Sequence, residues 1–187
     1  MSEHQWIEKI LAGDTQSFSC FVAKYQVMAF NIAYRVLENR EEAEEVVQDS
    51  FVKAYRALPG FQFESKFSTW FYKIVYNTAI TAQRRQPSSV SYNDIPLLEI
   101  TTEETDNAMA LLERKDRKEV IQLVLNKLPQ DEALLLTLYY LEENSVDDIR
   151  RITGLTPSNV KTKLFRGRKR FYEALQTTMK HEMHTIL

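Results

Sequence analysis

The chain has 187 residues, of which 44% are hydrophobic and 27% charged, and its formal net charge is −2. This length suits one large domain or two small ones, and the apolar fraction is enough for a packed core, which argues against a disordered chain. Four glycines, five prolines and recurrent apolar spacings near 3.6 favour helix over strand, so we expect an all-α fold.

Cysteine usage and the N-terminus restrict the compartment. The single cysteine, Cys20, rules out an internal disulfide and a cysteine-rich zinc site, and beside Phe21 it is expected to lie in the core. No basic segment followed by an apolar run opens the chain, and no stretch approaches the roughly 18 apolar residues of a spanning helix. We therefore expect a cytoplasmic protein with no membrane insertion.

Charge is unevenly distributed along the chain. Residues 1–86 carry ten basic and ten acidic side chains, residues 87–106 none and five, and residues 107–187 fourteen and eleven. The segment Arg84–Asn107 also mixes Pro, Ser, Thr and acids without sustained periodicity, which is typical of a linker. The prediction is two helical domains, 1–86 and 107–187, joined by a flexible acidic linker, 87–106; a surface loop within one domain is the alternative.

The first domain is predicted to be a helical bundle. Apolar residues recur at helical steps in the segments 7–11, 18–37, 39–58 and 67–86. Asn39 is expected to cap the third helix with Glu42 as its N3 partner, and Pro59-Gly60 to end it.

The second domain is predicted to contain a helix-turn-helix. Helices are expected at 111–128 and 130–141, and a third from Ser145, capped with the help of Asp148. Gly154 supplies the left-handed residue that ends it, and Thr156-Pro157 begins the next helix. Two helices joined through so tight a turn form the motif that places its second helix in a DNA major groove.

The second helix of this turn has one apolar face and one strongly basic face. Six cations and no acid occur between Lys161 and Arg170. Cations bind phosphates, and short polar or amide side chains meet base edges. The residues predicted to contact duplex DNA are Ser158, Asn159, Lys161, Thr162, Phe165, Arg166 and Lys169. An ordinary solvated basic face is the alternative.

Nine aromatic residues crowd into the positions from Phe51 to Tyr76. Helical spacing assigns Phe67, Phe71 and Tyr55 to the core, and a cluster that is entirely core is one open interpretation. In the other, Phe61 and Phe63 form a stacking platform for unpaired bases with a polar and cationic border of Lys66, Ser68, Thr69 and Lys73. Asn77, one turn after Lys73, is then a candidate reader of a base edge.

Two segments resemble a known family. EEAEEVVQDSFVKAYRALPGF followed by KFSTWFYKIVYNTA resembles regions 2.2 to 2.4 of the extracytoplasmic-function sigma factors of bacterial RNA polymerase. KLPQDEALLLTLYYLEENSVDDIRRITGLTPSNVKTKLFRGRKRF resembles their region 4. The order is the expected one and nearly the whole chain is covered. Two features depart from the family: Phe63 stands where glycine is common, and the basic run after Asn77 is short.

The resemblance implies partners and roles. Core RNA polymerase would be bound through its β′ clamp helices and β flap, the former by Glu45, Gln48, Asp49 and Phe51. The minus-ten element would be recognised and melted by Phe61, Phe63, Lys66, Trp70, Lys73, Ile74, Tyr76, Asn77, Arg84 and Arg85, with a flipped base near Phe61, Ile74 and Asn77. The helix from Ser158 would read the minus-thirty-five element of promoter DNA as duplex. An anti-sigma factor is an expected further partner.

Other functions have weaker support in the sequence. No phosphate loop, activated nucleophile, cofactor motif or small-molecule site is recognisable, so no enzyme is expected. His181 and His184 are interpreted as solvated residues and not as metal ligands. A free-standing helix-turn-helix regulator would account for the C-terminal half only, and a helical adaptor would need no base contacts.

Overall fold

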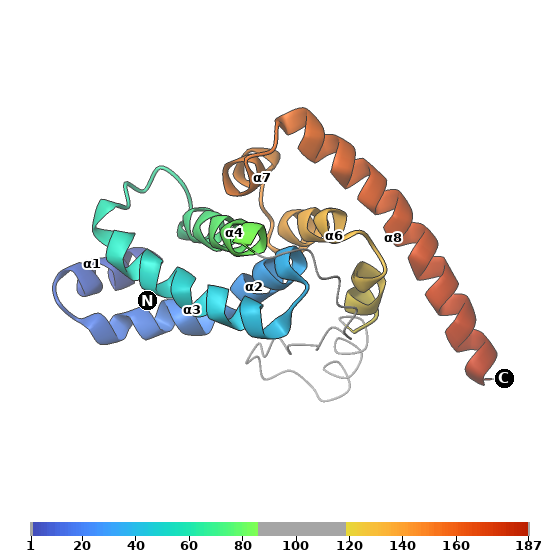
Figure 1. Cartoon of the computed structure of the whole chain (residues 1–187), viewed down its shortest axis with the longest axis horizontal. Helices are drawn as coiled ribbons and strands as arrows, with labels where there is room; N and C mark the ends of the chain where they lie inside the picture. The colour runs from blue at the N-terminus through green and yellow to red at the C-terminus, as the bar shows by residue number, and fades with distance from the viewer. Residues whose placement is uncertain (1, 86–118, 187) are drawn as a thin grey trace.

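The computed structural model describes residues 2–85 and 119–186, with side chains as far as Thr178. Within these two ranges every regular element is a helix, which confirms the all-α prediction (Figure 1). The first range contains α1 (Glu3–Leu11), η1 (Thr15–Ser17), α2 (Phe18–Leu37), α3 (Arg40–Ala57), η2 (Leu58–Gly60) and α4 (Phe67–Arg85). The second contains helical residues 119–126, then α6 (Gln130–Leu136), η3 (Thr137–Leu141), α7 (Val146–Thr153) and α8 (Pro157–Ile186).

Local signals set the two ends of α3 as predicted. The Asn39 side chain accepts a hydrogen bond from the Glu42 backbone N–H at 3.2 Å and caps α3. At its other end α3 passes into the short 3-10 turn that contains Pro59-Gly60. Because these caps satisfy backbone groups that a helix end leaves free, the boundaries follow from the local sequence alone.

An aromatic core holds α2, α3 and α4 together. The rings of Phe21 and Phe67 lie 4.1 Å apart, and those of Phe51 and Phe71 lie 4.6 Å apart. Phe21 and Phe71 are completely buried. Burying one such side chain contributes about 1.5–3 kcal/mol, so these rings are a large part of what orients α4.

The helix-turn-helix has the predicted caps. Ser145 and Asp148 form a reciprocal capping box at the start of α7, and Gly154 ends the helix with a φ of 74°. Thr156 accepts a hydrogen bond from the Asn159 backbone N–H at 3.3 Å, and Pro157 is the first residue of α8.

The predicted helix 130–141 is interrupted. After Leu136 the chain widens into the π-helical segment η3, where the Glu142 backbone N–H bonds to the Thr137 carbonyl at 3.1 Å. Asn144 is buried and donates from its side chain to the Leu138 carbonyl at 3.1 Å, and its backbone N–H bonds to the same oxygen. The Asn144 hydrogen bond that accompanies the π-helical segment forms where tertiary packing buries the side chain. Apolar periodicity, which is a local signal, therefore did not predict this segment.

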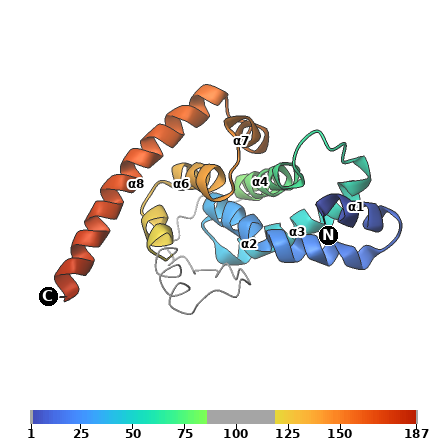
Figure 2. The same ribbon diagram turned by 180° about the vertical axis from the view of Figure 1, so that it is seen from behind.

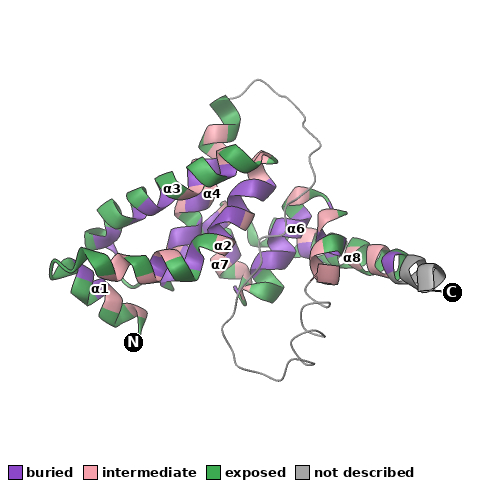
Figure 3. Ribbon diagram, turned by 90° about the horizontal axis from the view of Figure 1, so that it is seen from below, coloured by how far each residue is buried: buried purple, intermediate pink, exposed green. Residues whose placement is uncertain are grey.

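The two described ranges pack against each other. α7 contacts α4 and α6 contacts α2, while α8 lies on the far side of α6 (Figures 1 and 2). Buried residues of α2, α4, α6 and α7 belong to one continuous core (Figure 3). The predicted linker, and the first part of the helix expected at 111–128, lie outside the described residues, so the domain division stays a prediction. None of the described helices combines the length and apolar character needed to cross a membrane.

Candidate nucleic-acid interface

Contacts with α6 and η3 divide the cations of α8 into two groups. Lys163 bonds to Asp131, Arg170 bonds to Glu132 at 2.8 Å, and Arg168 donates to the Tyr140 hydroxyl at 3.3 Å. The other three, Lys161, Arg166 and Lys169, are exposed and have no ion pair or hydrogen bond within the described part of the chain. They are the three that the sequence assigned to DNA.

All seven residues predicted to contact duplex DNA are exposed on α8. One stripe contains Ser158, Thr162, the adjacent pair Phe165 and Arg166, and Lys169, each three or four residues beyond the last, and the Phe165 side chain is 65% exposed. We call this stripe, with Asn159 and Lys161, the α8 open face. Its uncompensated positive charge and short polar groups are the combination that a groove-reading helix needs.

Packing of α6 beneath α8 holds this face outward. A Cβ added to Gly167 would lie 3.3 Å from the Leu136 side chain, so glycine permits the close approach of the two helices. Glu132 is 5% exposed and receives the Arg170 guanidinium, which gives the buried carboxylate a charged partner.

The loop before α4 presents one aromatic ring and buries the other. Phe63 is 48% exposed and has a φ of 58°, the left-handed region in which glycine is favoured. Its ring stacks on His4 of α1 at 4.8 Å. Phe61, by contrast, is 8% exposed and lies between Phe63 and Trp70, at 4.8 and 5.1 Å. Of the two rings predicted to form a platform, only Phe63 is exposed, and Phe61 is buried in contact with it.

α4 carries two neighbouring stripes. The first stripe is exposed apart from the half-buried Trp70, and we call it the α4 open face. It contains Lys66, just before the helix, and Trp70, Lys73, Asn77 and Arg84. Thr69, Tyr72 and Tyr76 form the second stripe, which is buried or half-buried and faces the C-terminal half. Tyr76 therefore departs from its predicted grouping: it is half-buried on the second stripe, and this burial, with the charge of Asp131, raises the pKa of its hydroxyl. Ile74 is half-buried and Arg85 is exposed beyond the edge of the open face.

The predicted polymerase-binding residues on α3 also separate. Glu45, Gln48 and Asp49 are exposed, whereas Phe51 is 8% exposed and packs on Phe71 in the core. Two apolar residues that the sequence analysis did not assign to this surface are also exposed on it. Val52 is 48% exposed, and Tyr55, which was expected in the core, is 38% exposed. Their three- and four-residue spacing from Gln48 was the available signal.

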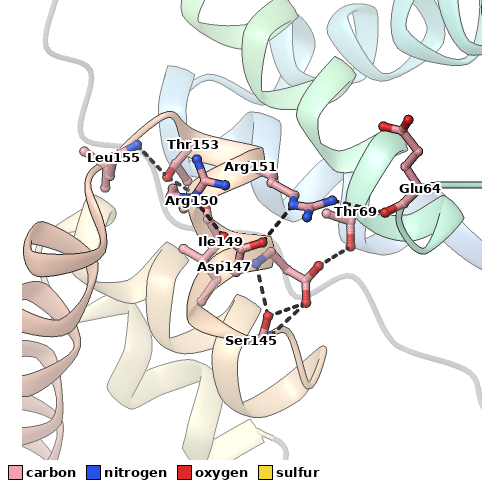
Figure 4. A network of polar contacts seen from close by, with 10 residues as sticks. Glu64, Thr69, Ser145, Asp147, Ile149, Arg150, Arg151, Thr153 and Leu155 are labelled. Carbon is pink, nitrogen blue, oxygen red and sulfur yellow. Dashed lines mark hydrogen bonds and ion pairs between the residues drawn. The ribbon is translucent and has the colours of Figure 1, made fainter.

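The sequence also missed the contacts between the two halves. Arg151 of α7 donates to the backbone oxygen of Glu64 at 3.1 Å, and the Thr69 hydroxyl donates to Asp148 at 3.2 Å (Figure 4). Partners 79 and 87 residues apart leave no local pattern to detect. Among the described residues, no group of three His, Cys, Asp or Glu could hold a metal ion.

Comparison with known proteins identifies both halves. Residues 21–88 match the family model "Sigma-70 region 2" and residues 118–171 match "Sigma-70, region 4". The RNA polymerase sigma-H factor of Pseudomonas aeruginosa is 31% identical over 95% of this chain and 96% of its own length. The ECF RNA polymerase sigma-E factor of Haemophilus influenzae is 30% identical over 96% and 98%. The chain belongs to the sigma-70 family, in its extracytoplasmic-function (ECF) branch.

Solved structures show the same fold. The Bartonella quintana sigma factor RpoE, in complex with the anti-sigma factor NepR, superposes with a TM-score of 0.60 at 20% identity, over 86% of this chain and 98% of that one. CnrH, in complex with the cytosolic domain of CnrY, gives 0.58 at 20% identity, over 92% and 96%. In this sigma factor the region 2 match begins within α2 and continues through α4, and the region 4 match ends within α8.

The division of cations on α8 of this sigma factor predicts unequal effects of their removal on stability. Arg170→Ala should lower the free energy of unfolding by about 1–3 kcal/mol, because the buried Glu132 carboxylate loses its charged partner. Arg166→Ala should change it by less than about 0.5 kcal/mol, because its side chain is exposed. Denaturant unfolding followed by circular dichroism measures both, and equal losses would contradict the division.

Proposed function

We propose that this ECF sigma factor binds core RNA polymerase, directs it to specific promoters and promotes DNA melting for transcription initiation. The supporting observation is that one chain presents two different nucleic-acid faces. The α8 open face is cationic and polar, whereas the α4 open face, with Phe63, combines an exposed ring with cations. The first suits a duplex groove and the second suits unpaired bases.

In this proposal α8 reads the minus-thirty-five element. Arg166 and Lys169 lie one turn apart or less and are free to reach bases or phosphates. Ser158, Asn159 and Thr162 stand near the N-terminal end of the helix, which approaches base edges in helix-turn-helix complexes. Phe165 offers an apolar surface for a thymine methyl group.

The minus-ten element is assigned to the loop and α4. A base that leaves the duplex stacks on the exposed Phe63 ring, while Asn77 offers an amide to its edge and Lys66, Lys73, Arg84 and Arg85 bind the backbone. Phe61 contributes by supporting Phe63 and Trp70 from below. Ile74 and Tyr76 are half-buried and shape the surface beside these groups.

Polymerase binding is assigned to α3. Glu45, Gln48 and Asp49, with Val52 and Tyr55 beside them, form the surface offered to the β′ clamp helices, and Phe51 holds that surface on the core. The β flap would contact the C-terminal half. An anti-sigma factor is a further proposed partner. Of the two similar structures, RpoE is in complex with the anti-sigma factor NepR and CnrH with the cytosolic domain of CnrY. We place the protein in the cytoplasm and assign it no catalysis of its own.

A free-standing helix-turn-helix regulator remains the weaker alternative. It accounts for α7 and α8, but it gives no role to the exposed surface of α3 or to the ring of Phe63. The family matches in both halves likewise favour a sigma factor.

Transcription with core polymerase tests the proposal directly. Purified core enzyme plus this protein should start transcripts at a discrete set of promoters in a genomic fragment library, read by runoff sequencing. Core enzyme alone is the control. If active core enzyme produced no new start sites when the protein was added, the proposal would be wrong.

Asn77→Ala should impair promoter opening and spare duplex recognition. Loss of one amide to a flipped base removes a hydrogen bond in the melted state only, so permanganate reactivity of unpaired thymines should fall several-fold. Binding of the holoenzyme to a minus-thirty-five duplex should not change. Gln26→Ala, which removes an exposed side-chain amide from α2, outside both proposed DNA faces, is the matched control. Equal loss of opening and duplex binding would contradict the assignment.

Arg166→Ala should weaken promoter duplex binding by about 1–3 kcal/mol if its guanidinium makes a bidentate base contact. Arg168→Ala removes a cation two residues further on that already bonds to Tyr140, so it should have a smaller effect. Fluorescence anisotropy at fixed salt compares the two variants. Equal affinities for Arg166→Ala and the unchanged protein would remove the base-reading role.

A further inference from the structure

The exposed ring of Phe63 has an aromatic partner outside its own loop. The imidazole of His4, in the first turn of α1, lies 4.8 Å from that ring with 27° between the two planes, so the rings are stacked. α1 also contacts η2, the turn that leads into the loop (Figure 1). Phe63 is still 48% exposed with His4 in place, so a base can reach the ring without displacing the imidazole. Two separate segments of the chain therefore build the surface around Phe63.

Hydrogen bonds hold the end of α1 that carries His4. A reciprocal capping box closes the first turn of this helix. The carboxylate of Glu3, which precedes His4 in the chain, accepts hydrogen bonds from two side chains of α2. These donors are the Lys24 ammonium, at 2.5 Å, and the Tyr25 hydroxyl. Because the first turn is bound to α2 in this way, the backbone of His4 has a defined position beside the loop.

The packing of α1 does not depend on the imidazole. Ile7 and Ile10 are buried and attach the helix to the core. His4 and Glu8 lie beside this apolar face and are exposed, with His4 Nδ1 3.3 Å from Glu8 Oε1. A substitution at His4 should therefore remove the stacked ring and leave α1 in place.

Phe63 has little other support on the outer side of the loop. Its φ of 58° belongs to a left-handed residue of the loop, and its neighbours Gln62 and Glu64 are exposed. Phe61 contacts the ring from the core side, with 55° between the planes. A ring that is already fixed loses less conformational freedom when a ligand stacks on it, so ordering the ring beforehand strengthens binding.

We propose that His4 is a positioning residue for the minus-ten base: its imidazole backs the Phe63 ring and holds it where an unpaired base stacks. The base lies on the side of Phe63 away from His4, so that base, phenyl ring and imidazole form three successive layers. This inference rests on the proposed function, which assigns Phe63 to the minus-ten element. The support of the ring by His4 can be measured without DNA.

Cleavage by chymotrypsin tests this support in the free protein. The protease must take the Phe63 ring into its apolar specificity pocket, so a contact that holds the ring slows cleavage after Phe63. His4→Ala should speed that cleavage several-fold, as followed by mass spectrometry, and leave the rates at other sites unchanged. His4→Phe, which keeps a ring, and Glu8→Ala, which keeps the imidazole, should behave as the unchanged protein does. Equal rates for His4→Ala and the unchanged protein would overturn the proposal.

Binding of an unpaired strand tests the role in recognition. Holoenzyme is reconstituted from core polymerase and this protein, and the probe is a fluorescein-labelled nontemplate single strand. The strand carries the minus-ten sequence of a promoter found by the runoff experiment. His4→Ala should weaken the affinity measured by anisotropy about two- to tenfold, the range expected for one aromatic pair. His4→Phe should restore most of the loss, and Glu8→Ala should cause none.

A double-mutant cycle separates positioning from a general structural effect. In a Phe63→Ala background His4→Ala should have no further effect on probe binding, because the ring that it positions is already absent. A loss of the same size in that background would overturn the proposal. Equal affinities for His4→Ala and the unchanged protein, with weaker binding by Phe63→Ala, would overturn it and leave the proposed function standing. Unchanged binding by Phe63→Ala would instead count against the minus-ten assignment of Phe63 and, with it, this inference.

Discussion

The salt bridge between Arg170 and the buried Glu132, together with the buried Val160 and Leu164, fixes which side of α8 faces water. Glu132 lies in the interface of α6 with α8, and leaving its carboxylate unpaired there would be costly. Lys163 and Arg168 bond to the same half of the molecule. Because half of the basic run is used within the protein, the remaining cations are held on one side, where they share a stripe with short polar residues. Apolar packing and ion pairs on the inner side of α8 thus leave the unpaired cations on its outer side.

α4 shows how one helix serves several surfaces at once. Phe67 and Phe71 enter the aromatic core, Thr69 and Tyr72 face α7, and Lys73 and Asn77 face solvent. These directions follow from the helical repeat, because residues three and four apart share a face. The contact with α7 and the proposed base-binding face therefore occupy neighbouring stripes of one helix.

Phe63, which stands where the family commonly has glycine, lies at a position with a left-handed backbone conformation. The resemblance places a common glycine at this position, and the backbone here has the left-handed conformation that glycine favours, with φ of 58°. A phenylalanine held in this way stores strain that the surrounding structure must offset. The gain is a ring that projects from the loop, rests on Phe61 and stacks with His4. Such a ring is available to a partner in a way that a buried one is not.

Local physics in the sequence determined the helices, their caps and the helix-turn-helix, because caps such as Asn39 and Ser145 and the left-handed Gly154 act on their own neighbours. The sequence also identified the exposed residues of α8, because residues three and four apart lie on the same face of a helix. Only the tertiary structure decided that Phe51 and Phe61 are interior, that Tyr55 is exposed, that Tyr76 lies toward the other half, and that α7 closes on α4. Those outcomes depend on partners distant in the chain, such as Tyr72 with Glu142, and no local spacing records them.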